Sequence, residues 1–243
     1  MIGVAIPAHD EEACLPACLA ALLRAARHPD LAAESVHACV VLDACVDASR
    51  AVVQRYQPLF RQAGCALDYL EIDARQVGAA RAAGARHLLA QGARWLAFTD
   101  ADTLVAPRWL AAQLALDADV VCGSVAVHDW TPHAAGAALL RERFGMHYQD
   151  RDGHRHIHGA NLGVSAAAYQ AAGGFASVAC HEDVLLVRTL EKMGARFAWS
   201  ALPRVSTSAR VDARARGGFG DTLLKMRLEI GERSALEDGL PAV

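Results

Sequence analysis

The chain has 243 residues, of which 53% are hydrophobic, and its formal net charge is −3. A chain of this size can bury a large core, and its composition excludes an intrinsically disordered protein. The basic residues are scattered, so a nucleic-acid partner is not expected. No apolar run is long enough to cross a bilayer. We therefore expect one domain, residues 1–243, in a cytoplasmic protein without a transmembrane segment, and the oligomeric state stays open.

The first half of the chain alternates short apolar runs with alanine-rich amphipathic stretches. The runs predict strands at residues 3–7, 36–43, 67–72 and 95–99, and the stretches predict helices at 11–27, 46–60 and 77–91. The strands lack regular polar alternation, and helices separate them. This pattern predicts a mainly parallel sheet with helices on both faces.

The second half is less regular. It predicts a strand at residues 119–127, a helix at 133–148, a tight turn at 159–165 that leads into a short helix, and a further helix at 181–193. Residues 149–158 form a polar loop that contains three alternating histidines, His154, His156 and His158. We interpret this loop either as a solvated segment or as a transition-metal site.

Acidic residues follow three of the predicted strands. Asp10 comes after the first, Asp43 ends the second, and Asp100 and Asp102 follow the fourth. The carboxyl ends of parallel strands meet at one edge of a sheet, where open α/β sheets bind ligands. Side chains two residues apart in an extended segment point the same way, so Asp100 and Asp102 can share one Mn²⁺ or Mg²⁺ ion. The alternative for this pair is a strand-ending turn that caps the next helix.

Five short motifs occur in order along the chain. They are VAIPAHDEE at residues 4–12, VLDACVDAS at 41–49, GAARAAG at 78–84, FTDAD at 98–102 and HED at 181–183. Together they resemble the successive signatures of family 2 glycosyltransferases, over roughly the first 200 residues.

The resemblance implies the GT-A fold, an α/β fold with a Rossmann-like, mostly parallel central sheet flanked by helices and a small acceptor-side subregion. It implies a nucleotide-binding half, residues 1–118, and an acceptor-binding half, residues 119–243. The implied activity is transfer of a sugar from a nucleoside-diphosphate sugar to an acceptor hydroxyl, with inversion at the anomeric carbon.

The resemblance also assigns residues to the nucleotide. Pro7, Ala8 and Asp10 would line its pocket, Asp43 would bond to the base, and Arg81 would lie near the base or ribose. Gly78 and Gly84 would permit close backbone approach. Taken alone, Asp43 is equally interpreted as a helix cap and Arg81 as part of a solvated helix face. The second motif carries fewer acidic groups than is common in the family, so the donor stays open between UDP-, GDP- and dTDP-sugars.

In the same way, Asp102, helped by Asp100, would hold the cation on the donor diphosphate, and Ala101 between them would contact the donor. The third metal ligand in the family is often a histidine near the C-terminus. Residues 206–210 contain no histidine at that place. The diphosphate itself would then supply part of the coordination.

Asp183 is the implied general base, because an inverting displacement needs a carboxylate that removes the acceptor proton. Glu182 would orient Asp183 or touch the acceptor, although an ordinary acidic first helical turn explains the same pair. Asn161 would close over the donor sugar and acceptor, with a local Asx turn as the alternative.

Three arginines near the C-terminus are candidates for binding the diphosphate. Guanidinium groups make paired bonds to phosphate oxygens, which suits Arg210, Arg214 and Arg216. Exposed arginines on a helix surface are the alternative.

Two other functions use some of the same residues. A HAD-type phosphohydrolase has an Asp-x-Asp pair after a strand, with Asp100 as its nucleophile, but its pattern normally lies near the start of a chain. A degenerate, non-catalytic module that binds nucleotide-sugars would keep the pocket without the chemistry.

Overall fold

The apolar runs of the first half form buried strands. Every residue of β2 is buried, and so is every residue of β1 except Pro7. Burial on both faces of the sheet accounts for the absence of polar alternation in these runs. The computed structural model describes residues 1–32, 34–178, 180–210 and 223–228. Its strands are β1 (Ile2–Ala8), β2 (Val36–Asp43), β3 (Ala66–Ile72), β4 (Trp95–Phe98), β5 (Thr103–Val105), β6 (Val120–Asp129), β7 (Leu162–Ser165) and β8 (Phe197–Ser208).

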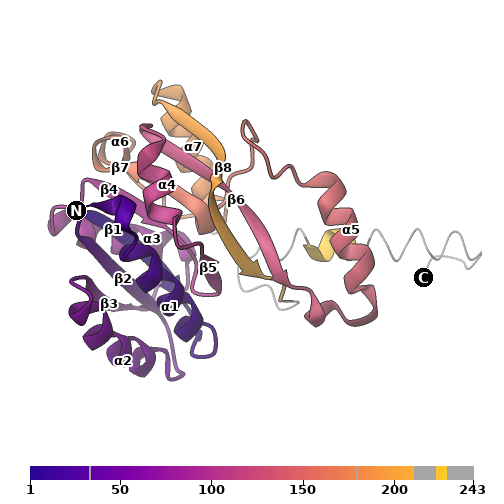
Figure 1. Cartoon of the computed structure of the whole chain (residues 1–243), viewed down its shortest axis with the longest axis horizontal. Helices are drawn as coiled ribbons and strands as arrows, with labels where there is room; N and C mark the ends of the chain where they lie inside the picture. The colour runs from indigo at the N-terminus through magenta and orange to yellow at the C-terminus, as the bar shows by residue number, and fades with distance from the viewer. Residues whose placement is uncertain (33, 179, 211–222, 229–243) are drawn as a thin grey trace, which may run out of the picture.

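These strands form one eight-stranded sheet in the order β3-β2-β1-β4-β7-β6-β8-β5 (Figure 1). The first four strands along the chain pair in parallel, and so do β6 and β8. β7 is antiparallel to both β4 and β6, and β5 is antiparallel to β8. The carboxyl ends of β1, β2 and β4 therefore meet at one edge, as the sequence predicts.

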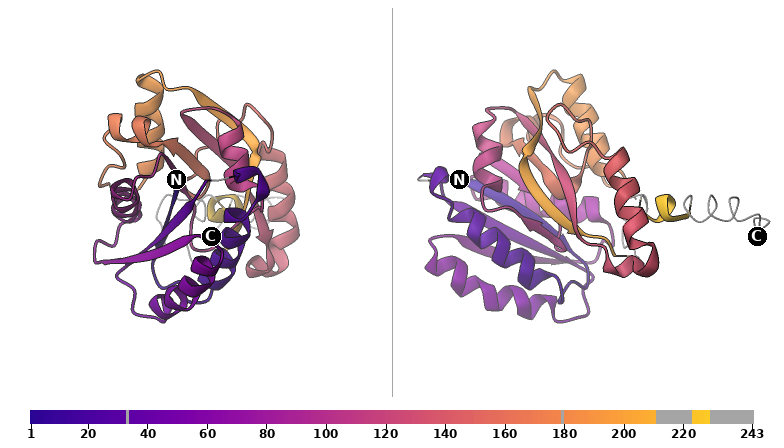
Figure 2. Two further views of the ribbon diagram at one scale, coloured as in Figure 1. Left: turned by 60° about the vertical axis from the view of Figure 1, so that its left-hand side comes forward. Right: turned by 45° about the vertical axis from the view of Figure 1, so that its right-hand side comes forward.

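Helices cover both faces of the sheet (Figure 2). The longer ones are α1 (Leu15–Ala26), α2 (Ser49–Gln62), α3 (Val77–Ala90), α4 (Trp109–Ala115), α5 (Ala137–His147), α6 (Ala166–Ala171) and α7 (Glu182–Lys192), with short 3-10 turns η1 (Pro29–Leu31), η2 (Thr131–Gly136) and η3 (Gly159–Asn161). One buried cluster joins the sheet to α1, α2 and α4, and the other joins it to α3, α6 and α7. The second layer carries the motif residues Arg81 and Glu182, which brings two sequence motifs to the same face.

Three strands were not predicted, and one of them corrects an expectation. Residues 162–165 form β7, not part of a turn leading into a helix. Gly163 explains the difference, because a Cβ there would lie 2.5 Å from Gln113 Oε1 and 2.6 Å from the Trp95 ring. The glycine looks like a turn signal in the sequence, but it is needed where two buried side chains cross the strand.

β8 was missed because Pro203 interrupts its apolar pattern. Its pairing with β6 shifts register between Gly123 and Val125, which is where the partner strand contains this proline. A proline at such an irregularity removes no ladder hydrogen bond.

The helix expected at 133–148 begins later than predicted. Residues 131–136 form the 3-10 turn η2, and α5 begins at Ala137. Ala134 has φ 49°, in the left-handed region that breaks an α-helix. In Figure 1, α5 extends from the body of the fold beyond the ends of β6 and β8.

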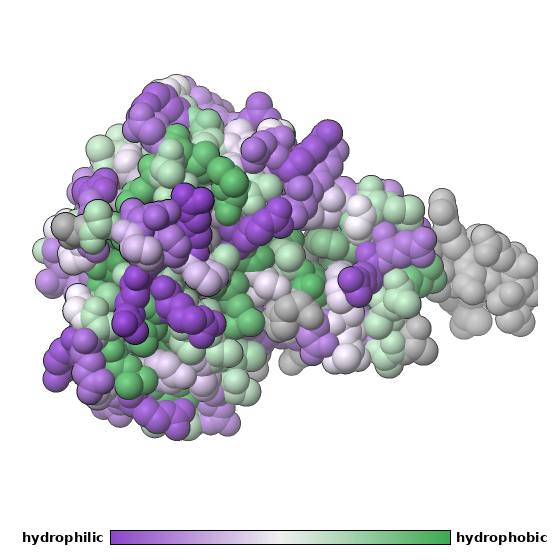
Figure 3. Space-filling model, in the orientation of Figure 1, coloured by the Kyte–Doolittle hydropathy of each residue, from purple (hydrophilic) through white to green (hydrophobic). Residues whose placement is uncertain are grey.

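The surface agrees with the scattered charge of the sequence. On the face seen in Figure 3, hydrophilic residues are spread between hydrophobic ones. No helix within the described residues is long and apolar enough to span a membrane.

Candidate active site

The loop after β1 is bonded to the loop after β2 through Asp10. Its Oδ1 accepts hydrogen bonds from the backbone N–H groups of Val46, at 2.7 Å, and Asp47, at 3.2 Å. Asp10 itself has φ 51°, a conformation that aspartate tolerates better than most residues. Pro7 and Ala8 directly precede this loop as the last two residues of β1. The predicted nucleotide pocket thus has its two loops fixed to each other.

Asp43 is buried and holds the loop between β3 and α3. Its carboxylate accepts backbone hydrogen bonds from Ala74, Arg75 and Gln76 at 2.7–2.8 Å. Gln76 is the residue before α3, so the helix-capping alternative is close to what the structure contains. His9 Nδ1 lies 2.6 Å from the Asp43 carbonyl oxygen, which ties the first two motifs together. A contact of Asp43 with a base stays a prediction.

Arg81 connects two carboxylates from different motifs. Its Nη2 donates to Asp100 Oδ1 at 2.5 Å, and its Nη1 donates to Glu182 Oε1. Arg81 is only 5% exposed, so it does not belong to a solvated helix face. Gly159 makes room for it, because a Cβ there would lie 2.4 Å from Arg81 Cζ, and Gly78 makes room for Glu182 in the same way. The resemblance implied a close backbone approach at Gly78. In the structure, the side chain that lies close to Gly78 is that of Glu182.

Burial and the neighbouring charges shift the pKa values of Arg81 and Asp100. Burial acts to lower the pKa of Arg81, but the charges of Asp100 and Glu182 outweigh burial and raise that pKa. Burial raises the pKa of Asp100, with Arg81 acting in the opposite direction. The guanidinium therefore stays charged and compensates two acidic groups at once.

Arg210 makes a second bridge, between Asp102 and Glu11. Its Nη2 lies 2.5 Å from Asp102 Oδ2 and 2.9 Å from Glu11 Oε1, and its Nε lies 3.1 Å from Asp102 Oδ2. Arg210 follows β8 and lies on no described helix, so the helix-surface alternative does not hold for it. Arg214 and Arg216 lie outside the described residues. Glu11 had no assigned role, although it lies in the first motif.

The Asp100–Asp102 pair fits part of a hard-cation site. Among the described residues, the contacts of Asp102 Oδ1 are long, 3.4 Å to the hydroxyl groups of Thr103 and Thr207. Ala101, between the two carboxylates, is 2% exposed. Within the described residues, no third histidine, cysteine or carboxylate groups with this pair. Two carboxylates with the remaining positions left to phosphate and water suit Mg²⁺ or Mn²⁺. The donor set therefore fits a cation that binds together with a diphosphate.

Asp183 bonds to the loop before β7, where Gly159 lies against the Arg81 side chain. Its Oδ2 accepts from the backbone N–H of Gly159 at 2.8 Å, and its Oδ1 accepts from Val184 N at 2.8 Å. His181, directly before α7, has a left-handed backbone with φ 63°. Glu182 is 3% exposed and Asp183 is half-buried. A buried, ion-paired Glu182 is not an ordinary solvated first turn, whereas Asp183 keeps partial access to solvent.

Asn161 holds three segments together. Its amide nitrogen donates to the carbonyl oxygens of Ser124 and Pro203, both at 2.7 Å, and its Oδ1 accepts from Trp109 Nε1 at 2.8 Å. The side chain is 1% exposed. These contacts are long-range, unlike those of a local Asx turn, and a contact with the donor sugar stays a prediction.

Gly123→Ala is expected to destabilise the protein by about 1–3 kcal/mol, the usual cost of overpacking. A Cβ at this position would lie 2.2 Å from Asn161 Nδ2, and three hydrogen bonds prevent Asn161 from moving aside. Gly145→Ala, in the open part of α5, is the matched control and is expected to be neutral or slightly stabilising. Urea unfolding of both variants measures the difference, and equal midpoints would contradict the packing role given to Asn161.

The three histidines of the polar loop stack on aromatic rings. Tyr148 and His156 are parallel, with centroids 4.1 Å apart, and Tyr148 Oη lies 3.0 Å from His158 Nε2. His154 is 1% exposed, and burial lowers the pKa of His158 to about 4. The solvated-loop interpretation is wrong for His154. The three do not group as metal ligands among the described residues.

Solved structures similar to this chain include complexes with nucleotides or a nucleotide-sugar. The mannosyltransferase PcManGT from Pyrobaculum calidifontis, in complex with GDP-Man and Mn²⁺, is 19% identical, covers 96% of this chain and 64% of its own, and superposes with a TM-score of 0.64. S. aureus TarS 1–349 in complex with UDP is 13% identical over 96% of this chain and 71% of its own, with a TM-score of 0.61. GalNAc-T7 with UDP, GalNAc and Mn²⁺ is 15% identical over 96% and 47%, with a TM-score of 0.64. This chain thus spans less than two thirds of the length of PcManGT and of GalNAc-T7.

The fold, with acidic motifs at the carboxyl edge of its sheet, is that of a GT-A glycosyltransferase. The family model described as glycosyl transferase family 2 matches residues 3–171, and the chain belongs to that family. No curated protein sequence matches the chain significantly. The membership confirms the family resemblance and favours this class over a HAD-type phosphohydrolase. The matched residues contain the first four motifs, and HED at 181–183 lies beyond them.

Proposed function

We propose that the protein is an inverting glycosyltransferase that moves a sugar from a UDP-, GDP- or dTDP-sugar to an acceptor hydroxyl. Asp183 is its general base, and Asp102 with Asp100 holds a Mn²⁺ or Mg²⁺ ion on the donor diphosphate. Pro7, Ala8 and Asp10 border the nucleotide.

The Arg81 bridge is the observation that supports this most strongly. It joins Asp100, of the metal motif, to Glu182, whose neighbour is Asp183. The two motifs are far apart in the sequence, yet a single guanidinium contacts both. A metal-assisted displacement needs a cation at the leaving group and a base at the attacking oxygen, within the length of one sugar.

In the proposed reaction, the acceptor oxygen attacks the anomeric carbon and gives its proton to Asp183. The bond from that carbon to the diphosphate oxygen breaks, and the nucleoside diphosphate leaves with the electron pair. A cation held by Asp102 and Asp100 would offset the negative charge that develops on this leaving group. Glu182, held by Arg81, keeps the first turn of α7 and hence Asp183 in position.

Arg210 has a second role in the proposal. Its guanidinium is ion-paired with both Asp102 and Glu11. If Asp102 held a cation together with a bound donor, the Arg210 guanidinium would be available to bind diphosphate oxygens.

Nucleotide-sugars are expected to stabilise the protein in a cation-dependent way, and Asp102→Ala is expected to abolish the effect. At a donor concentration about 100 times Kd, binding adds about 2.7 kcal/mol to the free energy of unfolding. A thermal-shift panel of UDP-, GDP- and dTDP-sugars, with and without Mn²⁺, measures this and selects the nucleotide. Glu71→Ala, which removes a carboxylate that is 55% exposed on β3, is the control and should keep the full shift.

A full panel without any stabilisation would contradict the proposal. Stabilisation that persists in Asp102→Ala would contradict the metal assignment alone. A thermal shift that is accompanied neither by sugar transfer to an acceptor nor by hydrolysis of the donor would favour the degenerate nucleotide-sugar-binding module.

A further inference from the structure

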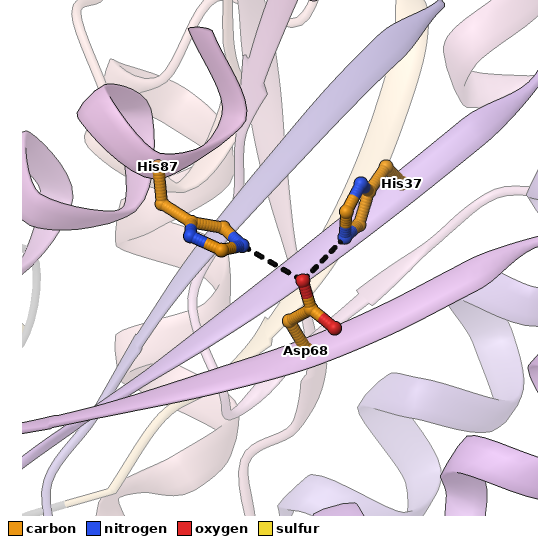
Figure 4. Close-up of side chains that lie close together, drawn as sticks. All are labelled: His37, Asp68 and His87. Atoms are coloured by element: carbon orange, nitrogen blue, oxygen red, sulfur yellow. Dashed lines mark hydrogen bonds and ion pairs between the residues drawn. The ribbon is translucent and has the colours of Figure 1, made fainter. Parts of the chain in front are cut away.

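Two histidines and an aspartate converge at the end of the sheet opposite the proposed active site. His37 lies near the start of β2, Asp68 lies on β3, and His87 lies near the end of α3 (Figure 4). His37 and Asp43 are six residues apart on the same strand, a distance of about 20 Å at the usual rise of a β-strand. This group of three is therefore separate from the carboxylates at the other edge.

Both imidazole rings direct the same kind of atom at one oxygen. His37 Nε2 lies 2.8 Å and His87 Nε2 lies 2.7 Å from Asp68 Oδ2. The rings meet edge to face, at 83° and with centroids 5.8 Å apart, so they converge on Asp68 and do not stack. The three ligand atoms all lie within 4.8 Å of one another.

We infer that His37, Asp68 and His87 form a binding site for a transition-metal ion, with Zn²⁺ as the expected ion. Two imidazole nitrogens and one carboxylate oxygen are a common set of protein ligands for zinc. An ion here replaces the two hydrogen bonds to Asp68, and each ring then carries its proton on Nδ1. The three side chains need to move apart only slightly to admit the ion. Each ligand atom lies about 2.0–2.2 Å from a zinc ion, so two ligand atoms are slightly further from each other than two hydrogen-bonded atoms.

The burial of the three side chains suits a bound ion with one open position. The His37 side chain is 11% exposed, that of His87 is 25% and that of Asp68 is 42%. The buried side chains hold the ion in place, while the exposed side of Asp68 leaves room for a water as fourth ligand. His37 is buried in β2 next to the apolar residues Val36 and Ala38, where an imidazole is costly unless it has a partner.

Such an ion would fasten an edge of the sheet. β3 is an outer strand of the sheet, with β2 as its only neighbour in the strand order. The three ligands come from β3, β2 and α3, so the ion links the edge strand to its neighbour and to the helix that packs on both. The inference does not depend on the proposed glycosyl transfer.

Calorimetric titration of the metal-free full chain with ZnCl₂ tests the site, and Co²⁺ serves as the spectroscopic probe. One zinc-binding event is expected, together with the visible absorption of four-coordinate Co²⁺. Both are expected to disappear in His37→Ala and in His87→Ala. Zinc is expected to raise the melting temperature of the unaltered protein and to leave that of His87→Ala unchanged.

Two control variants keep the result specific. His28→Ala removes a half-buried histidine that contacts Asp30 after α1, and it should retain the zinc event. Asp102→Ala should also retain it, because that residue lies at the other edge. Asp68→Asn covers the case of an alanine variant that fails to fold, since the amide still accepts a hydrogen bond but is a poor ligand. Absence of a zinc event, or one that survives His87→Ala or Asp68→Asn, would overturn the inference.

Discussion

Arg81→Met is expected to lower the free energy of unfolding by about 3–5 kcal/mol, the cost of leaving a buried charge without its partner. The Arg81 and Glu182 side chains are 5% and 4% exposed, so water cannot replace the lost ion pair. Asp100 adds less to this loss because its side chain is one-third exposed. Methionine keeps most of the apolar volume of the arginine, which limits the effect to charge and hydrogen bonding.

Arg86→Met on the same helix is the control, because Arg86 is exposed and should tolerate the change. Unfolding in urea compares the two variants. Adding Glu182→Gln to Arg81→Met removes the unpaired charge and should recover part of the loss, which a double-mutant cycle measures. Equal stability of the Arg81 and Arg86 variants would mean that the bridge is not a stabilising element.

The first half of the fold could be predicted from the sequence because its signals are local. β1 is apolar throughout, β2 is apolar between His37 and Asp43, and the helix that follows each strand has its own apolar face. β5, β7 and β8 could not be found this way. Residues of β5 pair with residues of β8 about a hundred positions later, Thr103 with Thr207, and such pairing leaves no local pattern. The glycine of β7 and the proline of β8 are turn signals in the sequence but packing features in the structure.

The candidate site was predictable as a set of residues, but not as a set of contacts. The motifs identify Arg81, Asp100, Asp102, Glu182 and Asp183. They do not indicate that Arg81 is bonded to a glutamate 101 residues away, or that an arginine binds a glutamate across 199 residues. Charge compensation depends on which side chains the sheet and its helices bring within reach, and that follows from the tertiary structure.

Asp183→Asn is expected to reduce the rate of sugar transfer by about 10²–10⁴-fold while leaving donor binding intact. In the proposed mechanism Asp183 takes the acceptor proton, and an amide cannot do so. The proposed cation ligands are Asp100 and Asp102, whereas the hydrogen bonds of Asp183 go to Gly159 and Val184. The cation-dependent thermal shift should therefore match that of the unaltered protein. Turnover with a transferred-sugar assay and the thermal shift are measured on the same preparation.

The backbone hydrogen bonds of Asp183 require a stability control for the Asp183→Asn variant. Both oxygens of Asp183 accept backbone N–H groups, from Gly159 and Val184, and asparagine can satisfy only one of them through its oxygen. The variant's melting temperature without donor therefore has to be compared with that of Glu191→Gln, an exposed carboxylate on the same helix. If Asp183→Asn keeps its donor-dependent shift and still transfers sugar at a rate close to that of Glu191→Gln, the proton goes elsewhere. If transfer and the donor shift vanish together, Asp183 supports the donor pocket, and its assignment as a base that is not needed for donor binding is wrong.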